Sequence, residues 1–146
     1  MPRYADTILC ELIRMESNNK LSLFGLFGHG IFVQQVPVVL PGFAFLQRWE
    51  PTADELPGTL FSFSIRLRGP NLDLEIYPPT NVPVPSPPRP LMQIAVQVQG
   101  IPFAQEGDYD LLTSVNNEVR HRETFFIVIP TPQQLRDFAL TGFAPT

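Results

Sequence analysis

The sequence has little of the reactive chemistry on which most enzymes depend. Its 146 residues include one cysteine, Cys10, one lysine, Lys20, and two histidines, His29 and His121, in distant turns. A lone cysteine cannot close an intrachain disulfide, and a thiol in an apolar strand without a basic neighbour is expected to be buried and unreactive. We therefore expect a reducing compartment and a cytoplasmic location.

Charge is also scarce. Charged residues make up 16% of the chain and the net charge is −4, against ~25% charged residues in ordinary soluble domains. Without a run of Lys and Arg, nothing indicates a nucleic-acid partner. Residues 21–47 carry no formal charge, but they include prolines, glycines and glutamines. We expect successive strands there rather than a membrane segment, and we predict no membrane partner.

Motifs for metals, phosphates and nucleophiles are missing. No C-x-x-C, H-x-x-x-H or H-E-x-x-H spacing points to zinc, and no G-x-S-x-G turn points to a nucleophilic serine. The glycines in residues 25–30 lack the lysine and the following helix of a phosphate-binding loop. We predict no catalytic residue, no cofactor, no metal site and no enzyme activity. A serine–histidine–acid set assembled in space, and hence a hydrolase, stays open as a third hypothesis.

Two acidic loops leave one alternative for a metal. Glu106, Asp108 and Asp110 alternate where a loop enters a strand, and Asp54 and Glu55 lie in another loop. If the two loops meet at one end of the fold, their oxygens would suit calcium. If they do not meet, they are solvated acidic turns.

Proline and phenylalanine are abundant, at 17 and 12 residues. Prolines scattered between apolar runs indicate short strands separated by turns. Period-two alternation is clearest in residues 59–68. Further strands are expected at 31–36, 43–50, 72–76, 92–99, 109–115 and 122–129. Residues 37–42 belong at an edge or in a connection, and the proline-rich residues 78–90 are expected to be extended, near polyproline II.

An opening hairpin organises the chain. Residues 5–15 and 21–27 are two predicted strands, joined by a turn that contains Asn18 and Asn19. Asparagine tolerates the positive φ of a tight reversal. Later strands are expected to add to this hairpin and to form a sheet.

These strands predict an all-β protein, a single antiparallel β-sandwich of about 8–9 strands that is immunoglobulin- or C2-like. The sandwich is expected to span residues 1–130, with residues 131–146 as a C-terminal helix and tail packed on it. Thr131 fits the N-cap and Gln134 completes a capping box. Gly142 is the expected end of the helix.

Two segments carry a resemblance to a known family. Residues 5–10, followed by Lys20-Leu21-Ser22-Leu23-Phe24-Gly25, resemble the K-L-S-L-x-G opening hairpin of a family of uncharacterised bacterial all-β domains. Residues 102–109 and 126–129 resemble its closing hairpin. The resemblance implies a sandwich fold and no particular activity. By analogy with immunoglobulin-like sandwiches, the hydroxyl of Tyr109 would bond to upstream backbone.

Three surface features are candidate partner-binding sites. Pro85, Pro88 and Arg89 form a P-x-x-P-R pattern, which aromatic grooves bind in polyproline form; the alternative is a stiff connector. Gln93, Gln97 and Gln99 form an uncharged row that is either an interaction face or an ordinary solvent-facing side of a strand. Trp49 is either a stacking surface for a partner or ligand, or part of the core.

The absence of a catalytic cluster and the low surface charge favour a non-enzymatic interaction or assembly module. It would act through protein–protein contacts, with a protein partner or as a homo-oligomer. The alternative is a β-sandwich that binds a small ligand, a carbohydrate or calcium, with Trp49 and the acidic loops as its site.

Overall fold

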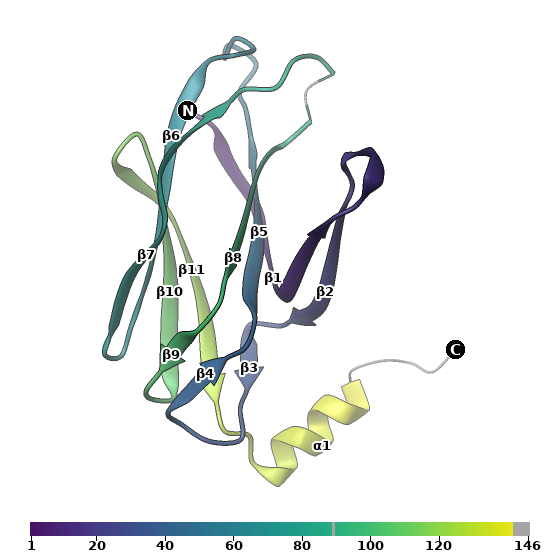
Figure 1. The fold of residues 1–146 in the computed structure, drawn as a ribbon, viewed down its shortest axis with the longest axis vertical. Coiled ribbons are helices and arrows are strands. Elements are labelled where there is room, and N and C mark those ends of the chain that lie inside the picture. The colour runs from purple at the N-terminus through teal and green to yellow at the C-terminus, as the bar shows by residue number, and fades with distance from the viewer. Residues whose placement is uncertain (89, 142–146) are drawn as a thin grey trace.

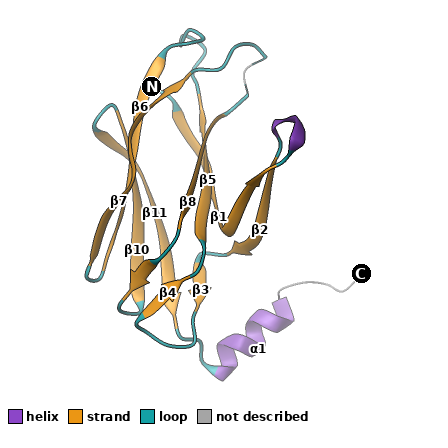
Figure 2. Cartoon of the chain, in the orientation of Figure 1, coloured by secondary structure: helices purple, strands orange, loops and turns teal. Residues whose placement is uncertain are grey.

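The computed structural model describes residues 1–88 and 90–141 and shows two sheets packed around a shared core (Figure 1, Figure 2). The first sheet, called the β1 sheet, has the strand order β2 (Leu21–Phe27), β1 (Arg3–Met15), β5 (Phe43–Glu50), β8 (Met92–Val98). The second, called the β10 sheet, has the order β3 (Gly30–Phe32), β11 (Glu118–Val128), β10 (Gly107–Val115), β6 (Leu60–Gly69), β7 (Leu72–Pro83). A small third sheet pairs β4 (Val38–Leu40) with β9 (Ile101–Phe103).

The predicted sandwich is confirmed, with more strands than expected. The described residues form 11 strands, because two short segments, β4 and β9, pair with each other. The β10 sheet is mixed, since β3 runs parallel to β11. β3 is also shorter than the predicted strand at 31–36. After the amide of Val33 donates to the carbonyl of Val128 at 3.0 Å, the chain turns away at Gln34 and Gln35.

The proline-rich segment 78–90 is extended in its first half, as predicted, and there it forms part of an edge strand. β7 continues through Pro83, and Thr80 and Val82 pair with Phe63 and Phe61 of β6. β7 is the last strand of its sheet, so one side of its backbone needs no partner, and proline is tolerated there.

The core lies between the inner faces of the two sheets, where period-two alternation directs the side chains. The odd-numbered residues of β6 from Phe61 to Leu67 are buried, as predicted. Cys10 is completely buried, also as predicted, and burial raises the pKa of its thiol. Full burial of each large apolar side chain stabilises the fold by about 1.5–3 kcal/mol.

Tyr109 forms the predicted corner. Its hydroxyl donates to the backbone oxygen of Gln105 at 2.7 Å, while its ring is fully buried. Gly69 makes room for the ring, because a Cβ at that position would lie 2.2 Å from a ring carbon of Tyr109. Asn116 and Asn117 have φ values of 50° and 67° and form the tight turn between β10 and β11.

The opening hairpin turns through a 3₁₀ segment, η1 (Ser17–Asn19). The C-terminal helix α1 (Pro132–Thr141) begins with the predicted capping box. The amide of Gln134 donates to Oγ1 of Thr131 at 3.2 Å, and the amide of Thr131 donates to Oε1 of Gln134 at 2.8 Å. The helix projects from one end of the sandwich (Figure 1), and the side chains of residues 131–137 are all exposed. Gly142 lies outside the described residues.

Candidate functional site

The β1–β2 hairpin, residues 11–27, leaves the sandwich as a separate two-stranded ribbon (Figure 1). β1 pairs with β5 only as far as Cys10, whereas its pairing with β2 continues to Met15. Gly42 lies beside this departure, and a Cβ there would be 2.5 Å from the backbone oxygen of Glu11. Glycine is therefore needed where β5 begins against the hairpin.

One side-chain contact fastens the hairpin to the sandwich. The backbone amide of Ile13 donates to Oε1 of Gln97 in β8 at 3.1 Å. Because β5 no longer runs beside Ile13, this amide oxygen takes the place of a strand partner. A groove of about 230 Å³ between the two elements is lined by Ile13, Met15, Leu21, Ala95, Val96 and Gln97.

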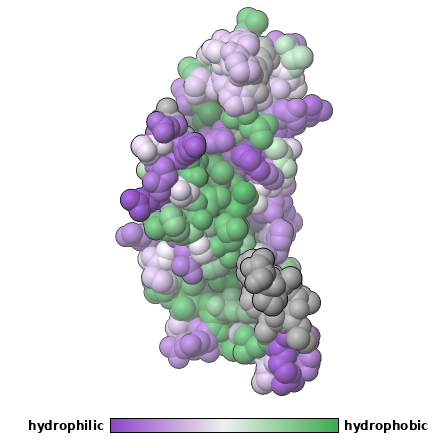
Figure 3. All heavy atoms as spheres, turned by 90° about the vertical axis from the view of Figure 1, so that its right-hand side faces the viewer, coloured by the Kyte–Doolittle hydropathy of each residue, from purple (hydrophilic) through white to green (hydrophobic). Residues whose placement is uncertain are grey.

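The other face of the hairpin carries exposed apolar side chains. Leu12 and Phe24 lie opposite each other on β1 and β2, and are 42% and 45% exposed. Leu26, on the same face of β2, is 66% exposed. Figure 3, which looks onto this side of the molecule, shows a band of apolar surface running down its middle. A contiguous apolar patch of this kind marks an interaction surface more often than chance exposure does.

β2 is also an unprotected sheet edge. It ends the β1 sheet, and its seven residues include no charge and no proline. The edge strand β7 is different, since it carries Asp73 and Glu75 as well as three prolines. Charges and prolines discourage an edge strand from pairing with another chain. β2 lacks both, so its outer side is suited to accept a further strand.

Glu123 makes hydrogen-bond contacts with three side chains where β1 and β11 face each other. Its Oε2 atom lies 3.0 Å from the hydroxyl of Tyr4 and 2.7 Å from Nε2 of His121. Its Oε1 atom lies 3.2 Å from Nε2 of His29. The ring of Tyr4 stacks on that of His121, with centroids 3.3 Å apart. The two histidines, expected in unrelated turns, therefore share one carboxylate.

Hydrogen bonds connect Glu123 to the core. The hydroxyl of Tyr4 lies 2.9 Å from that of Thr7. Because an ionised carboxylate only accepts, Tyr4 donates to Glu123 and accepts from Thr7. Thr7 in turn accepts from Nε2 of Gln47 at 3.3 Å. The Oε1 atom of Gln47 accepts at 2.8 and 2.9 Å from two buried donors, Trp49 and Thr113. The network thus links both sheets.

The surroundings keep Glu123 ionised and Tyr4 neutral. Burial opposes ionisation of Glu123, but hydrogen bonds from His121, Tyr4 and His29 outweigh burial and hold the pKa of its carboxyl below the ordinary 4.5. Burial, together with the charge of Glu123, raises the pKa of Tyr4 to about 12. A fixed negative charge therefore lies at this side of the sandwich.

A groove of about 200 Å³ opens beside Glu123, and we call it the Glu123 groove. Apolar side chains form much of its wall, and Glu123 and His29 provide polar groups. The residues that line it are Thr7, Ile8, Leu9, Leu26, Phe27, Gly28, His29 and Glu123. An apolar channel beside a carboxylate suits an alkylammonium group, because the stem packs on carbon and the head pairs with the charge.

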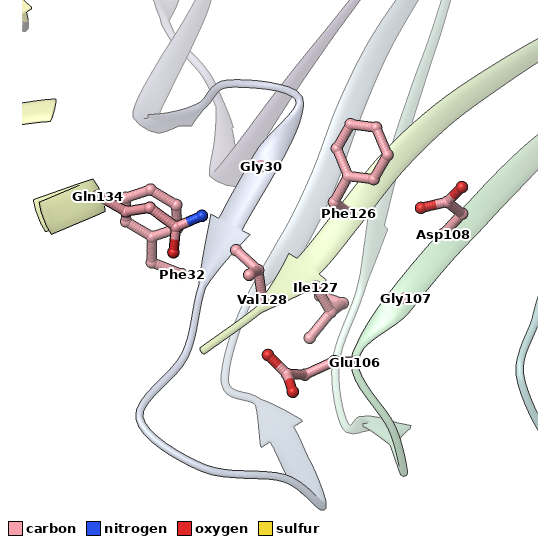
Figure 4. Close-up of a pocket in the computed structure, with 9 residues that line it drawn as sticks. All are labelled: Gly30, Phe32, Glu106, Gly107, Asp108, Phe126, Ile127, Val128 and Gln134. Carbon is pink, nitrogen blue, oxygen red and sulfur yellow. The ribbon is translucent and has the colours of Figure 1, made fainter. Parts of the chain in front are cut away.

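A larger groove, of about 510 Å³, lies between β3, β11 and the start of α1. Figure 4 shows Phe32 and Gln134 on one side of it and Glu106 and Asp108 on the other. Phe126 is 44% exposed and pairs with Asp108 across β10 and β11. We call this the Phe126 groove.

The structure places the predicted partner residue Trp49 in the core, where it is 1% exposed. Its indole N–H is bound by Gln47, and its ring packs edge-on against Phe63 at 5.4 Å. Trp49 shares the inner face of β5 with other buried aromatics, so it is out of reach of a partner or a sugar.

The other predicted partner residues lie at the surface. Gln93, Gln97 and Gln99 are exposed, although Gln97 uses its amide oxygen within the chain. Pro88 is exposed and Pro85 is half-buried. Arg89 lies outside the described residues. Among these residues, Gln97 lines the groove between β8 and the hairpin.

The two acidic loops do not converge. Asp54 and Glu55 precede β6, whereas Asp110 pairs with Arg68 near the far end of that strand. The carboxylate of Asp110 also accepts a hydrogen bond from the hydroxyl of Thr124 at 2.6 Å and forms an ion pair with Arg122 at 2.7 Å. Over residues 1–88 and 90–141, no group of three or more metal-ligating side chains comes together, so the loops give no calcium site.

Sequence reasoning missed both the Glu123 cluster and the departure of the hairpin. His121 and Glu123 are two residues apart in a strand, so the sequence alone could have predicted that their side chains lie on the same face. Nothing in the local sequence places Tyr4 or His29 beside them, because that depends on how the sheets pack.

Within the described part of the chain, no helix is long and apolar enough to cross a membrane.

The comparisons with known proteins agree with the resemblance in the two hairpins. The model of the family of unknown function DUF6941 matches residues 6–128, and the chain belongs to this family. No curated protein matches the chain.

Proposed function

We propose that this member of DUF6941 is a non-enzymatic interaction module that binds protein through the β1–β2 hairpin. The observation that carries the proposal is the outer strand β2, which is uncharged, lies at a sheet edge and exposes Phe24 and Leu26. Strand addition supplies main-chain hydrogen bonds, and alternate side chains supply specificity. A partner here would remove both the apolar face and the open edge from water.

The Glu123 cluster supports a binding role better than a catalytic one. All three hydrogen-bonding neighbours point at one carboxylate, and the hydroxyl among them belongs to Tyr4. A phenol with a pKa of about 12 keeps its proton at neutral pH and makes a poor nucleophile. In the part of the chain that the structure describes, no serine bonds to His29 or His121.

Photo-crosslinking tests the proposal. A photoreactive phenylalanine analogue replaces Phe24 in one variant and Phe126 in another, since these rings have matching exposures of 45% and 44%. Illumination of host cells should give protein adducts at position 24 and few at position 126. Adducts at 126 with none at 24 would overturn binding through the hairpin.

A second candidate function is small-ligand or carbohydrate binding in the Phe126 groove. The exposed ring of Phe126 lies beside the carboxylate of Asp108, and a ring next to an acceptor is a common way to bind a sugar. A panel of sugars should then raise the melting temperature of the wild type but not of Phe126→Ala. An equal response from both proteins would remove this candidate.

A further inference from the structure

We propose that the partner is a second copy of this chain, joined by antiparallel pairing of β2 with β2 of that copy. The inference rests on the proposed function, because it names the occupant of the same hairpin edge. The pairing would extend the β1 sheet of each copy across a two-fold axis.

Strand length fixes the register. β2 runs from Leu21 to Phe27, so full antiparallel overlap with its own copy centres on Phe24. Phe24 then lies opposite Phe24 of the second copy, and Ser22 lies opposite Leu26 of the second copy. Directly opposed residues share a face. The exposed side chains of both hairpins therefore meet on one side of the joined sheet, with small Ser22 accommodating the larger Leu26.

Charge permits this pairing. β2 has no charged residue, so no charged side chains lie directly opposite each other along the joined strands. Like charges directly opposite each other on neighbouring strands are destabilising. The edge strand β7 is less suited to pair with a second copy of itself, because Asp73 and Glu75 of one copy would face the same acidic strand of the other.

The residue that precedes β2, Lys20, is complementary in charge to Glu123. In the same register Lys20, which is exposed, lies opposite Gly28 of the second copy. Gly28 lines the Glu123 groove together with Leu26, His29 and Glu123. Lys20 also falls on the face of the strand that Leu26 occupies, so its side chain points toward this groove.

The groove suits that side chain. The apolar wall takes the methylene stem of Lys20, and the ionised carboxylate of Glu123 takes the ammonium group. Oε1 of Glu123 accepts from one neighbour, His29, whereas Oε2 accepts from two, so Oε1 has capacity for a further donor. Two-fold symmetry repeats the ion pair at both ends of the joined strands.

Cysteine crosslinking tests the register in the full-length chain. Paired Cα atoms in antiparallel strands lie about 4.5–5.5 Å apart, within the range that a disulfide spans. Phe24→Cys should therefore give a crosslinked dimer on mild oxidation. Ser22→Cys should not, because its own copy lies several residues away, but Ser22→Cys combined with Leu26→Cys should. Cys10 is buried and does not compete.

Light scattering on a sizing column tests the charge pair. The wild type should have twice the 16.5 kDa mass of one chain. Lys20→Glu should weaken association by at least about tenfold, since it places like charges together. Arg120→Glu, the same charge change on exposed β11, should leave association unchanged. Circular dichroism verifies that each variant is folded.

The outcomes separate this inference from the proposed function. A monomeric wild type, or a dimer that neither Phe24→Cys crosslinks nor Lys20→Glu weakens, overturns the two-fold pairing. If photo-crosslinks at position 24 then lead to a different protein, the interaction module stands with another partner. If position 24 gives no adduct as well, both proposals fail.

Discussion

Glu123 and His29 lie 94 residues apart in the chain, yet Oε1 of Glu123 is 3.2 Å from Nε2 of His29. The contact crosses from β11 to the turn between β2 and β3. It adjoins the base of the exposed hairpin, because His29 and Leu26 line the same groove. The cluster therefore ties the sandwich to the element that we propose binds a partner.

Glu123→Gln is expected to reduce stability at neutral pH by about 1–3 kcal/mol, the usual effect of weakening hydrogen bonds to a charged group. The folded state lowers the pKa of Glu123, so its contribution is present above the ordinary pKa of 4.5 and is lost as pH falls through the folded value. Urea denaturation between neutral and acidic pH measures this. The gap between wild type and variant should narrow in acid, and a gap that widens would contradict the contact.

Tyr4 should titrate with a pKa of about 12, against 10 for a free phenol. Because the folded-state pKa is raised, the stabilisation is full below pH 10 and is lost as pH rises through about 12. The phenolate absorbance of the wild type minus that of Tyr4→Phe reports this group. A midpoint at the ordinary value would contradict the burial of Tyr4 and its contact with Glu123.

Gln97→Ala should loosen the hairpin without unfolding the sandwich. It removes the acceptor of the Ile13 amide, so that amide should exchange with solvent faster, while the amides of β6 should be unaffected. Gln93→Ala is the matched control on the same exposed face of β8. Equal exchange at Ile13 in both variants would mean that Gln97 does not fasten the hairpin.

Gln47→Ala should be among the most destabilising changes in β5. Gln47 is fully buried, and its loss leaves the donors of Trp49 and Thr113 without their acceptor. Each buried donor left without an acceptor lowers the free energy of unfolding by about 1–3 kcal/mol. Chemical denaturation should show a loss of several kcal/mol, whereas Gln93→Ala should be near neutral. A small loss at Gln47 would show that other groups satisfy those donors.

Local patterns predicted the parts of the fold that depend on local chemistry. Alternation in β6, the asparagine turns and the capping box of α1 follow from side-chain direction and backbone preference. The exposed departure of the hairpin did not follow, because it depends on β5 beginning beside Cys10, so that the rest of β1 has no β5 residue paired with it. Trp49 was ambiguous for a similar reason. Its burial depends on Gln47 and Thr113, which come from different sheets.

The most direct test of association through β2 is the solution mass of the full-length wild type beside that of Leu26→Lys, measured by light scattering over a dilution series. Leu26 is 66% exposed, so lysine there is compatible with folding but places two charges inside the proposed contact. We expect the wild type at twice the 16.5 kDa chain mass and Leu26→Lys at the chain mass. The same mass for both proteins, whether monomer or dimer, would contradict association through β2.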